Sequence, residues 1–324
     1  MNKAIHKRKL PSAAKVRRKS VHALVILGRT AFVVGICFLI LYPLLTKISM
    51  SFMEQVDLYD RTVQSIPKNF TWLNYPEAME MMSYGRAFLS TFFICFLSAA
   101  CQAFACVLTG YGFARFQFKL RGPMFVLVVI MMVIPPQIIL TPLYLNFQNF
   151  DPLGLISRFN GGKGLRLIES IVPFLLISLT ATGPRNGLYI FLARQFFRGF
   201  PGAIDEAATI DGATHRRVFF SIMLPAAVPI LATIFLFAFV WLWNDNMYAF
   251  LFYSKLPTVA KALLSMDLQF SQIHVNMSAG ASDIGYFAIM KSTGVLLAIL
   301  PLMIMYALLQ KVFIRSIERT GMVG

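Results

Sequence analysis

Residues Glu206–Pro225 read EAATIDGATHRRVFFSIMLP, a polar stretch in a chain that is otherwise mostly apolar. The alanine-rich run Ala203–Ile210 predicts a short helix, and Asp211-Gly212 is a turn signal. Thr214 can cap a second helix, which should break or kink at Pro225 because proline cannot continue the helical hydrogen bonds. The stretch therefore predicts two short helices joined at the glycine, although an ordinary loop of no special function has a similar appearance.

The composition predicts an all-α, polytopic membrane protein. Of the 324 residues, 57% are hydrophobic and 14% are charged, whereas soluble domains carry about 25% charged residues. A helix of about 20 apolar residues crosses the bilayer core. Six segments qualify, and their even number places both termini on one side: Leu24–Ile48, Ala87–Gly112, Pro123–Leu145, Leu167–Leu192, Ala226–Phe250 and Tyr286–Leu309.

The distribution of basic residues predicts the orientation of these six segments. The two terminal regions and the loops at 113–122 and 193–226 together hold 19 of the 30 Lys and Arg residues, whereas the three opposite loops hold ten. Because basic residues concentrate in cytosolic loops, both termini and the Glu206 stretch are expected in the cytosol. Met1–Ser20 contains eight basic residues and no acid. Residues 1–23 are therefore predicted to form a basic cytosolic tail. Met1–Ser20 is expected to be disordered and to lie on the cytosolic leaflet, where anionic lipids attract basic residues.

The remaining loops and cysteines suggest structural rather than catalytic roles. The first outer loop is expected to contain a small helix at Asn74–Met82, and small residues at 98–100 and 103–105 predict close helix packing. The four cysteines lie inside apolar runs without metal-binding spacing. Gly161-Gly162-Lys163-Gly164 has the wrong spacing for a phosphate-binding loop. We expect no catalytic residue, no metal site and no nucleic-acid binding.

The polar stretch also resembles a known family. Membrane subunits of ABC importers share a spaced pattern that this stretch keeps at Glu206-Ala207-Ala208, Gly212, Ile222 and Leu224-Pro225. The sequence around it is similar to the sugar-importer form, as in the maltose importer G subunit. This resemblance implies a type I ABC importer permease fold over residues 24–324, with a shared core at about 86–310 and a coupling loop at 199–225 that docks on an ATPase subunit. The implied ATPase-coupling residues are Glu206, Ala207, Ala208, Asp211, Gly212, Leu224 and Pro225.

The same resemblance implies the partners and the location. The chain would be a multi-pass protein of the bacterial inner membrane, in contact with lipid, with a second permease subunit, two ATPase subunits and an extracytoplasmic sugar-binding protein. ATP and Mg²⁺ would be bound by the ATPases, so this chain would carry no cofactor and would not be an enzyme. The last outer loop, Tyr253–Ser282, resembles the loop that reaches into the binding protein in the maltose system.

Five residues are candidates for lining a translocation pathway. Pro135 interrupts the third segment and indicates either a simple kink or a bent, pathway-lining helix. Arg185 lies in the break Gly183–Gly187, and an ionisable residue at membrane depth is a functional candidate, unless it reaches to the interface. Trp243, Asn244 and Asp245 combine an aromatic face with polar groups, as carbohydrate binding requires, although aromatic residues are also common at the interface.

The function that these patterns favour is import of a sugar or oligosaccharide by alternating access. The alternative is an ion-coupled secondary transporter, which would need buried acids and paired repeats. The specific sugar stays open, and so does direct contact of this subunit with it. The mildly basic outer loops do not select acidic sugars, and an acidic oligosaccharide such as alginate remains among the candidates.

Overall fold

The computed structural model describes residues 13–63, 66–276 and 281–321, and within them the regular structure is helical. The longer helices are α1 (Ala13–Ser51), α3 (Tyr84–Arg115), α4 (Arg121–Val133), α5 (Pro136–Gln148), α8 (Asn186–Arg198), α12 (Val228–Trp243), α14 (Val259–Asn276) and α15 (Ala281–Gly321). The shorter ones are α2 (Asn74–Met81), α6 (Leu155–Phe159), α7 (Val172–Leu179), α9 (Ala203–Ile210), α10 (His215–Val218), α11 (Leu224–Ala226) and α13 (Met247–Phe252). The 3-10 helices are η1 (Gln55–Leu58) and η2 (Pro152–Gly154), and a π-helix, η3, covers Phe219–Met223.

Three of the six predicted segments are single helices long and apolar enough to cross a membrane: parts of α1 and α15, and α3. The pair α4–α5, bent by 105° at Ile134-Pro135, and α10–α12, bent by 71°, are long and apolar enough to bring the number to five if each bent pair is one span. Proline favours extended backbone in the residue before it, and Ile134 and Pro135 both adopt it. The fourth predicted segment is divided into α7 and α8, at the break expected from Gly183–Gly187.

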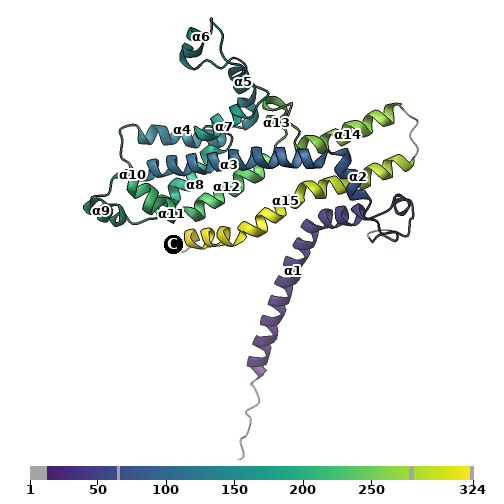
Figure 1. Ribbon diagram of the computed structural model, residues 1–324. Helices are drawn as coiled ribbons and strands as arrows, with labels where there is room; N and C mark the ends of the chain where they lie inside the picture. The colour runs from purple at the N-terminus through teal and green to yellow at the C-terminus, as the bar shows by residue number, and fades with distance from the viewer. Residues whose placement is uncertain (1–12, 64–65, 277–280, 322–324) are drawn as a thin grey trace, which may run out of the picture.

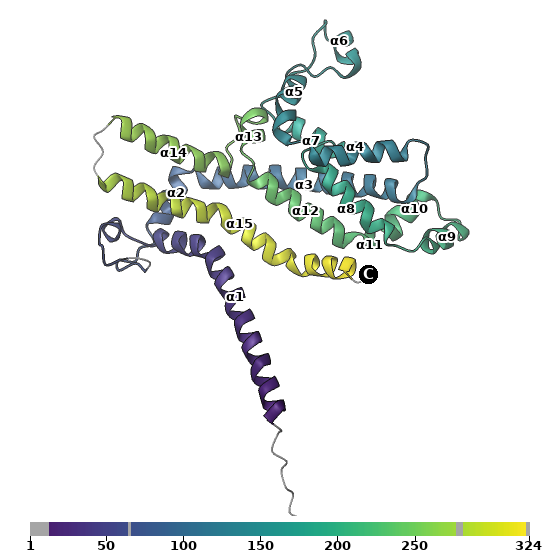
Figure 2. The same cartoon turned by 180° about the vertical axis from the view of Figure 1, so that it is seen from behind.

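Helix α3 is the centre of the bundle and packs against α7, α8, α12 and α14. Figure 1 shows it crossing the body, and in the reverse view of Figure 2 α12 and α15 lie before it. The predicted small-residue face is confirmed, because Ser98, Ala99 and Ala103 are buried. A Cβ atom added to Gly110 would lie 2.5 Å from the Cβ of Ala193 in α8. Small side chains of this kind let two membrane helices approach closely.

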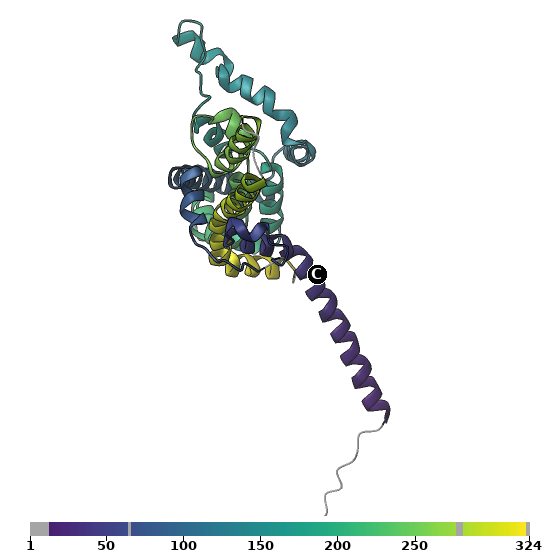
Figure 3. The same cartoon turned by 90° about the vertical axis from the view of Figure 1, so that its right-hand side faces the viewer.

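Helix α1 stands apart from the rest of the chain. No residue at 24–50 of its apolar part is buried within this chain. Figure 3 shows α1 projecting away from the bundle. Its outer end contacts α15, where the Lys47 ammonium donates a 3.3 Å hydrogen bond to Ser292. The prediction of a disordered tail is wrong for residues 13–20, because α1 begins at Ala13. Residues 1–12 lie outside the described residues.

The outer loops are more ordered than the sequence predicts. The expected helix after Asn74 is confirmed as α2. Asp57 is buried and accepts hydrogen bonds from the backbone of Lys68 and Asn69. Hydrogen bonds from Lys68 and Thr62 hold the pKa of Asp60 well below its usual range. Residues 253–282, interpreted as the last outer loop, are helical for the greater part, because α14 packs there against α3 and α15.

Candidate functional site

The predicted two-helix arrangement at residues 199–225 is present at one end of the bundle, where Figure 1 shows α9, α10 and α11 together. Helix α9 begins with Asp205 and Glu206 in its first turn, where negative charge is favourable for the helix dipole. The Glu206 side chain is exposed, Ile210 is 85% exposed, and Ala208 is buried. A charged residue and a large apolar residue are therefore displayed together at this end, as a protein-docking surface requires.

Gly212 joins the two helices through a left-handed backbone conformation with φ of +79°. Its N–H donates to the carbonyl of Thr209, and the N–H of Ala213 donates to the carbonyl of Ala208. This pair of bonds is the Schellman motif, which closes a helix and favours glycine because glycine has no Cβ to clash. The turn predicted at Asp211-Gly212 is therefore present and has its own hydrogen bonds.

The second half of the loop contains the predicted cap and bend. The side chain of Thr214 accepts a hydrogen bond from the N–H of Arg217 and caps α10. The chain then forms the π-helix η3 and passes through Leu224-Pro225 in α11. The bend expected at Pro225 falls at Ala227, two residues later, between α11 and α12. Pro225 is accommodated in the first turn of α11, where its missing N–H does little harm.

Three contacts connect this loop to the central helix. The Arg115 Nε atom at the end of α3 lies 3.2 Å from a carboxylate oxygen of Asp205, and Arg115 also donates to the carbonyl of Phe200. The ring of Tyr111 packs on Phe219, with centroids 4.9 Å apart. Helix α9 is thus joined to the end of α3 by an ion pair, and η3 is joined to α3 by packed rings.

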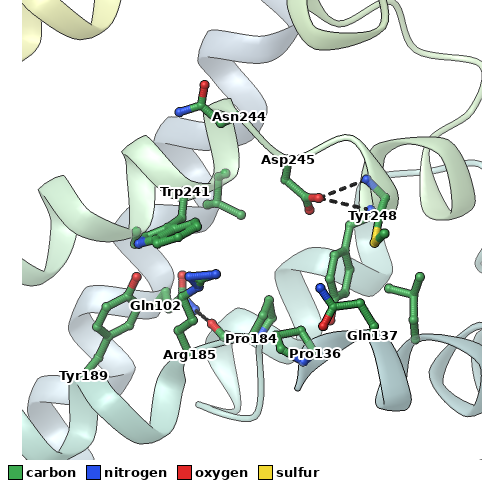
Figure 4. Close-up of a pocket in the computed structure, with 14 residues that line it drawn as sticks. Gln102, Pro136, Gln137, Pro184, Arg185, Tyr189, Trp241, Asn244, Asp245 and Tyr248 are labelled. Atoms are coloured by element: carbon green, nitrogen blue, oxygen red, sulfur yellow. Dashed lines mark hydrogen bonds between the residues drawn. The ribbon is translucent and has the colours of Figure 1, made fainter. Parts of the chain in front are cut away.

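A cavity lined by both apolar and polar side chains lies at the breaks in the third, fourth and fifth segments. Its volume is about 190 Å³, and its walls come from α3, α5, α8 and α12. Figure 4 shows the side chains that surround it: Gln102, Pro136, Gln137, Pro184, Arg185, Tyr189, Trp241, Asn244, Asp245 and Tyr248. Amide, carboxylate, guanidinium and phenol groups thus converge at a site where the helices are interrupted.

Arg185 and Asp245 both face this cavity. The guanidinium carbon of Arg185 lies 3.0 Å from the centroid of the Trp241 ring, a cation–π contact. The Asp245 carboxylate accepts from the backbone N–H groups of Met247 and Tyr248 and so begins α13. Arg185 has a φ of +64° and lies at the beginning of α8, so its half-buried position beside the cavity depends on the break.

Gln102 holds the break between α7 and α8 in place. This side chain of α3 is buried and donates to the carbonyl of Pro184 at 3.0 Å and to the amide oxygen of Asn186. Asn186 is also buried, and its Nδ2 has no partner among the described residues. The cluster therefore depends on Gln102, because buried polar groups without hydrogen bonds are costly.

Replacing Gln102 by leucine is expected to lower the free energy of unfolding by about 2 kcal/mol, because two buried acceptors lose their donor. Thermal unfolding of the purified protein measures this effect. Gln137→Leu is the matched control, since that side chain is exposed and its replacement leaves no buried acceptor. Equal melting temperatures for the two variants would contradict the role of Gln102.

The candidate residues from the sequence are only partly brought together. Arg185, Asn244 and Asp245 line the cavity. The Trp243 side chain is buried elsewhere and donates to the carbonyl of Ala298 in α15. Pro135 lies at the bend, while its neighbour Pro136 lines the cavity. Sequence reasoning missed Gln102, Tyr189 and Trp241. Trp241 could have been distinguished from Trp243, because residues two positions apart on a helix point to different sides of it.

Comparisons with known proteins agree with this architecture. Residues 106–319 match the family described as binding-protein-dependent transport system inner membrane component. The melibiose/raffinose/stachyose import permease protein MelC of Bacillus subtilis is 29% identical over 311 residues, covering 95% of this chain and 99% of that protein. The maltodextrin transport system permease protein MalD of Streptococcus pneumoniae is 28% identical over 316 residues, covering 96% and 98%.

A solved structure supports the fold. A chain of a bacterial ABC transporter involved in the import of the acidic polysaccharide alginate superposes with a TM-score of 0.65, covering 91% of this chain and 96% of that one, at 21% identity. The predicted importer permease fold is thereby confirmed. Since the family match covers most of the chain, this protein belongs to the inner-membrane permease components of binding-protein-dependent ABC transport systems.

Proposed function

We propose that this chain is one of two permease subunits of an ABC importer that carries a sugar or oligosaccharide into the cytoplasm. The observation that carries the proposal is the exposed α9 surface, with Glu206 beside Ile210 and a fixed turn at Gly212. The carbohydrate class is supported by the names of relatives that span nearly the whole chain. It is also supported by a cavity that combines Trp241 with amide and charged groups.

In the proposed mechanism, two separate ATPase subunits bind ATP and Mg²⁺ and push the coupling loop when they close. Glu206, Ala207, Asp211 and Gly212 form the docking surface, the buried Ala208 holds α9 against the rest of the chain, and Leu224-Pro225 lead through the bend at Ala227 into α12. The Arg115–Asp205 ion pair transmits this movement to α3, so the cavity opens alternately to the two sides. An extracytoplasmic binding protein delivers the sugar, and this chain supplies no cofactor and no catalytic residue.

The proposed setting is the bacterial inner membrane, with both termini in the cytosol. The basic residues at 13–23, at the beginning of α1, are proposed to meet the anionic leaflet, and residues 24–324 to form the permease domain. The projecting apolar part of α1 must be covered by lipid or by the second permease, because no residue at 24–50 is buried within this chain. The translocation pathway includes Arg185, Asn244 and Asp245, with Trp243 and Pro135 holding the helices around it.

The test is sugar-stimulated ATPase activity of the reconstituted complex with Glu206→Gln. We expect about a tenfold loss, which corresponds to one charge-assisted hydrogen bond to the ATPase. Lys119→Gln is the control, because Lys119 is exposed between α3 and α4, outside the proposed docking surface. If wild-type protein transports sugar in vesicles without any ATPase subunit, the importer proposal is wrong and an ion-coupled secondary transporter replaces it.

A further inference from the structure

A second hollow, lined by both apolar and polar side chains, lies between the first half of α14 and the facing part of α15, next to the end of α12. Its volume is about 340 Å³, within the range typical of small-molecule sites. The polar side chains among its lining residues are Asn244, Asn246, Asp267 and Lys291. Figure 2 shows α14 and α15 running alongside each other, with the end of α12 nearby. We call this hollow the outer groove.

The charged pair in the outer groove indicates which environment it faces. The Lys291 ammonium on α15 and the Asp267 carboxylate on α14 form an ion pair, with side chains 41% and 37% exposed. Lys291 lies within the apolar span Gly285–Gln310. Half-exposed charges at membrane depth are costly against lipid and face water-filled cavities or protein instead. The outer groove is therefore not part of the lipid-facing surface.

Both walls of the groove are firmly held. The backbone N–H of Val259, at the beginning of α14, donates to the buried Thr91 hydroxyl of α3 at 2.9 Å. Lys261 donates to three carbonyls of the preceding turn. On the other side, the Trp243 indole donates to the α15 carbonyl of Ala298 at 3.0 Å. These bonds fix Asp267 opposite Lys291, so the groove is formed before any ligand arrives.

The outer groove and the cavity of Figure 4 meet at one residue. Asn244 lines both, because it lies at the end of α12 where the helix separates the two hollows. We propose that the outer groove is a second carbohydrate-binding position of this subunit, which holds one residue of a neutral oligosaccharide next to the cavity at Arg185. This inference rests on the proposed importer function and adds the position and charge class of the substrate.

The chemistry of the groove favours a neutral sugar. Sugar hydroxyls both donate and accept, and the groove offers a carboxylate, an ammonium and two amides, which together supply both kinds of group. One acid and one base leave the groove without net charge. A uronate carboxylate would find its only cation, Lys291, already paired with Asp267. An acidic sugar would therefore break an ion pair, whereas a neutral sugar uses the bonding positions that the pair leaves free.

The test is uptake into proteoliposomes that contain the complete importer and its binding protein. The probes are the neutral trisaccharides raffinose and maltotriose and the acidic trimannuronate. We expect Asp267→Asn and Lys291→Gln each to raise the KM for the transported neutral trisaccharide about tenfold, through loss of a charge-assisted hydrogen bond. Lys255→Gln is the matched control, because it removes an outer ion pair with Glu169 outside the groove.

A charge exchange separates binding from a structural role. The double variant Asp267→Lys, Lys291→Asp keeps the ion pair but reverses the donor and acceptor positions. A sugar-binding role predicts that its KM stays raised, while a purely structural pair predicts return to the wild-type KM and overturns the inference. Preferential uptake of trimannuronate by wild type also overturns it. If none of the three sugars is taken up and none stimulates ATPase activity, the proposed carbohydrate function itself fails.

Discussion

Proline at position 212 is expected to abolish sugar-stimulated ATPase activity, leaving only the unstimulated rate. The native φ of Gly212 is +79°, whereas proline is fixed near −65°. The substitution also removes the N–H that donates to Thr209, and it disfavours the helical backbone of Asp211 before it. Loss of the Schellman motif would turn α9 away from its docking direction without altering the cavity. The measurement is ATPase activity of the reconstituted complex with loaded binding protein.

Two further variants show whether this effect comes from the backbone. Gly212→Asn should retain most of the stimulation, because asparagine tolerates the left-handed conformation better than other side chains. Gly202→Ala should behave as wild type, since an added Cβ there meets nothing within 4 Å. Full stimulation in the proline variant, with the ATPase subunits still bound, would show that the turn at Gly212 does not carry the coupling.

The substitution Gly110→Val is expected to destabilise the bundle more than Gln102→Leu does. The added Cβ would lie 2.5 Å from the Cβ of Ala193 and 2.8 Å from the backbone nitrogen of Arg194. Backbone cannot yield as a side-chain end can, so α3 and α8 must separate. Overpacking of this kind costs about 3 kcal/mol, and we expect the melting temperature of the purified complex to fall by about 6 °C or more.

Gly112→Val is the control for this prediction. Gly112 lies two residues later on the same helix, and a Cβ atom there meets nothing within 4 Å. Both variants therefore change helix propensity equally, but only the variant at Gly110 introduces a clash. If both valine variants melt at the same temperature, the close approach of α3 and α8 makes no special contribution to stability. Unequal melting temperatures would assign the difference to the contact at Ala193.

The fold was predictable from the sequence where one local signal decided it. Gly212, Thr214 and the small residues of α3 each have a single conformational or steric consequence, and the structure contains all three. The position of the bend near Pro225 was less accurate, because proline fits the first turn of α11 and the bend falls at Ala227. Proline indicates that a helix is interrupted, while packing decides at which residue.

The candidate site was less predictable, because its residues come from segments far apart in the sequence. Gln102 and Asn186 are 84 positions apart, and nothing local indicates their hydrogen bond. Trp241 and Trp243 are two positions apart, so they face different sides of α12. Lys291 lies within the predicted sixth segment, Tyr286–Leu309, and the structure places it in α15, where it pairs with a residue of α14. Its partner, Asp267, was hidden by the interpretation of α14 as a loop.

The close contact at Gly110 also has a mechanical consequence. It divides α3 unequally, with five residues on the side of Arg115 and 26 on the side of Tyr84, or about 8 Å and 39 Å at 1.5 Å per residue. If α3 tilts about this contact as a rigid rod, it is a lever with a short inner arm and a long outer arm. A shift of 1 Å at the ATPase end then becomes about 5 Å at the outer end. If the proposed ATPase subunits moved this end of α3, the small-residue contact at Gly110 would be the pivot, and a small displacement at the inner end would give a larger one at the outer end.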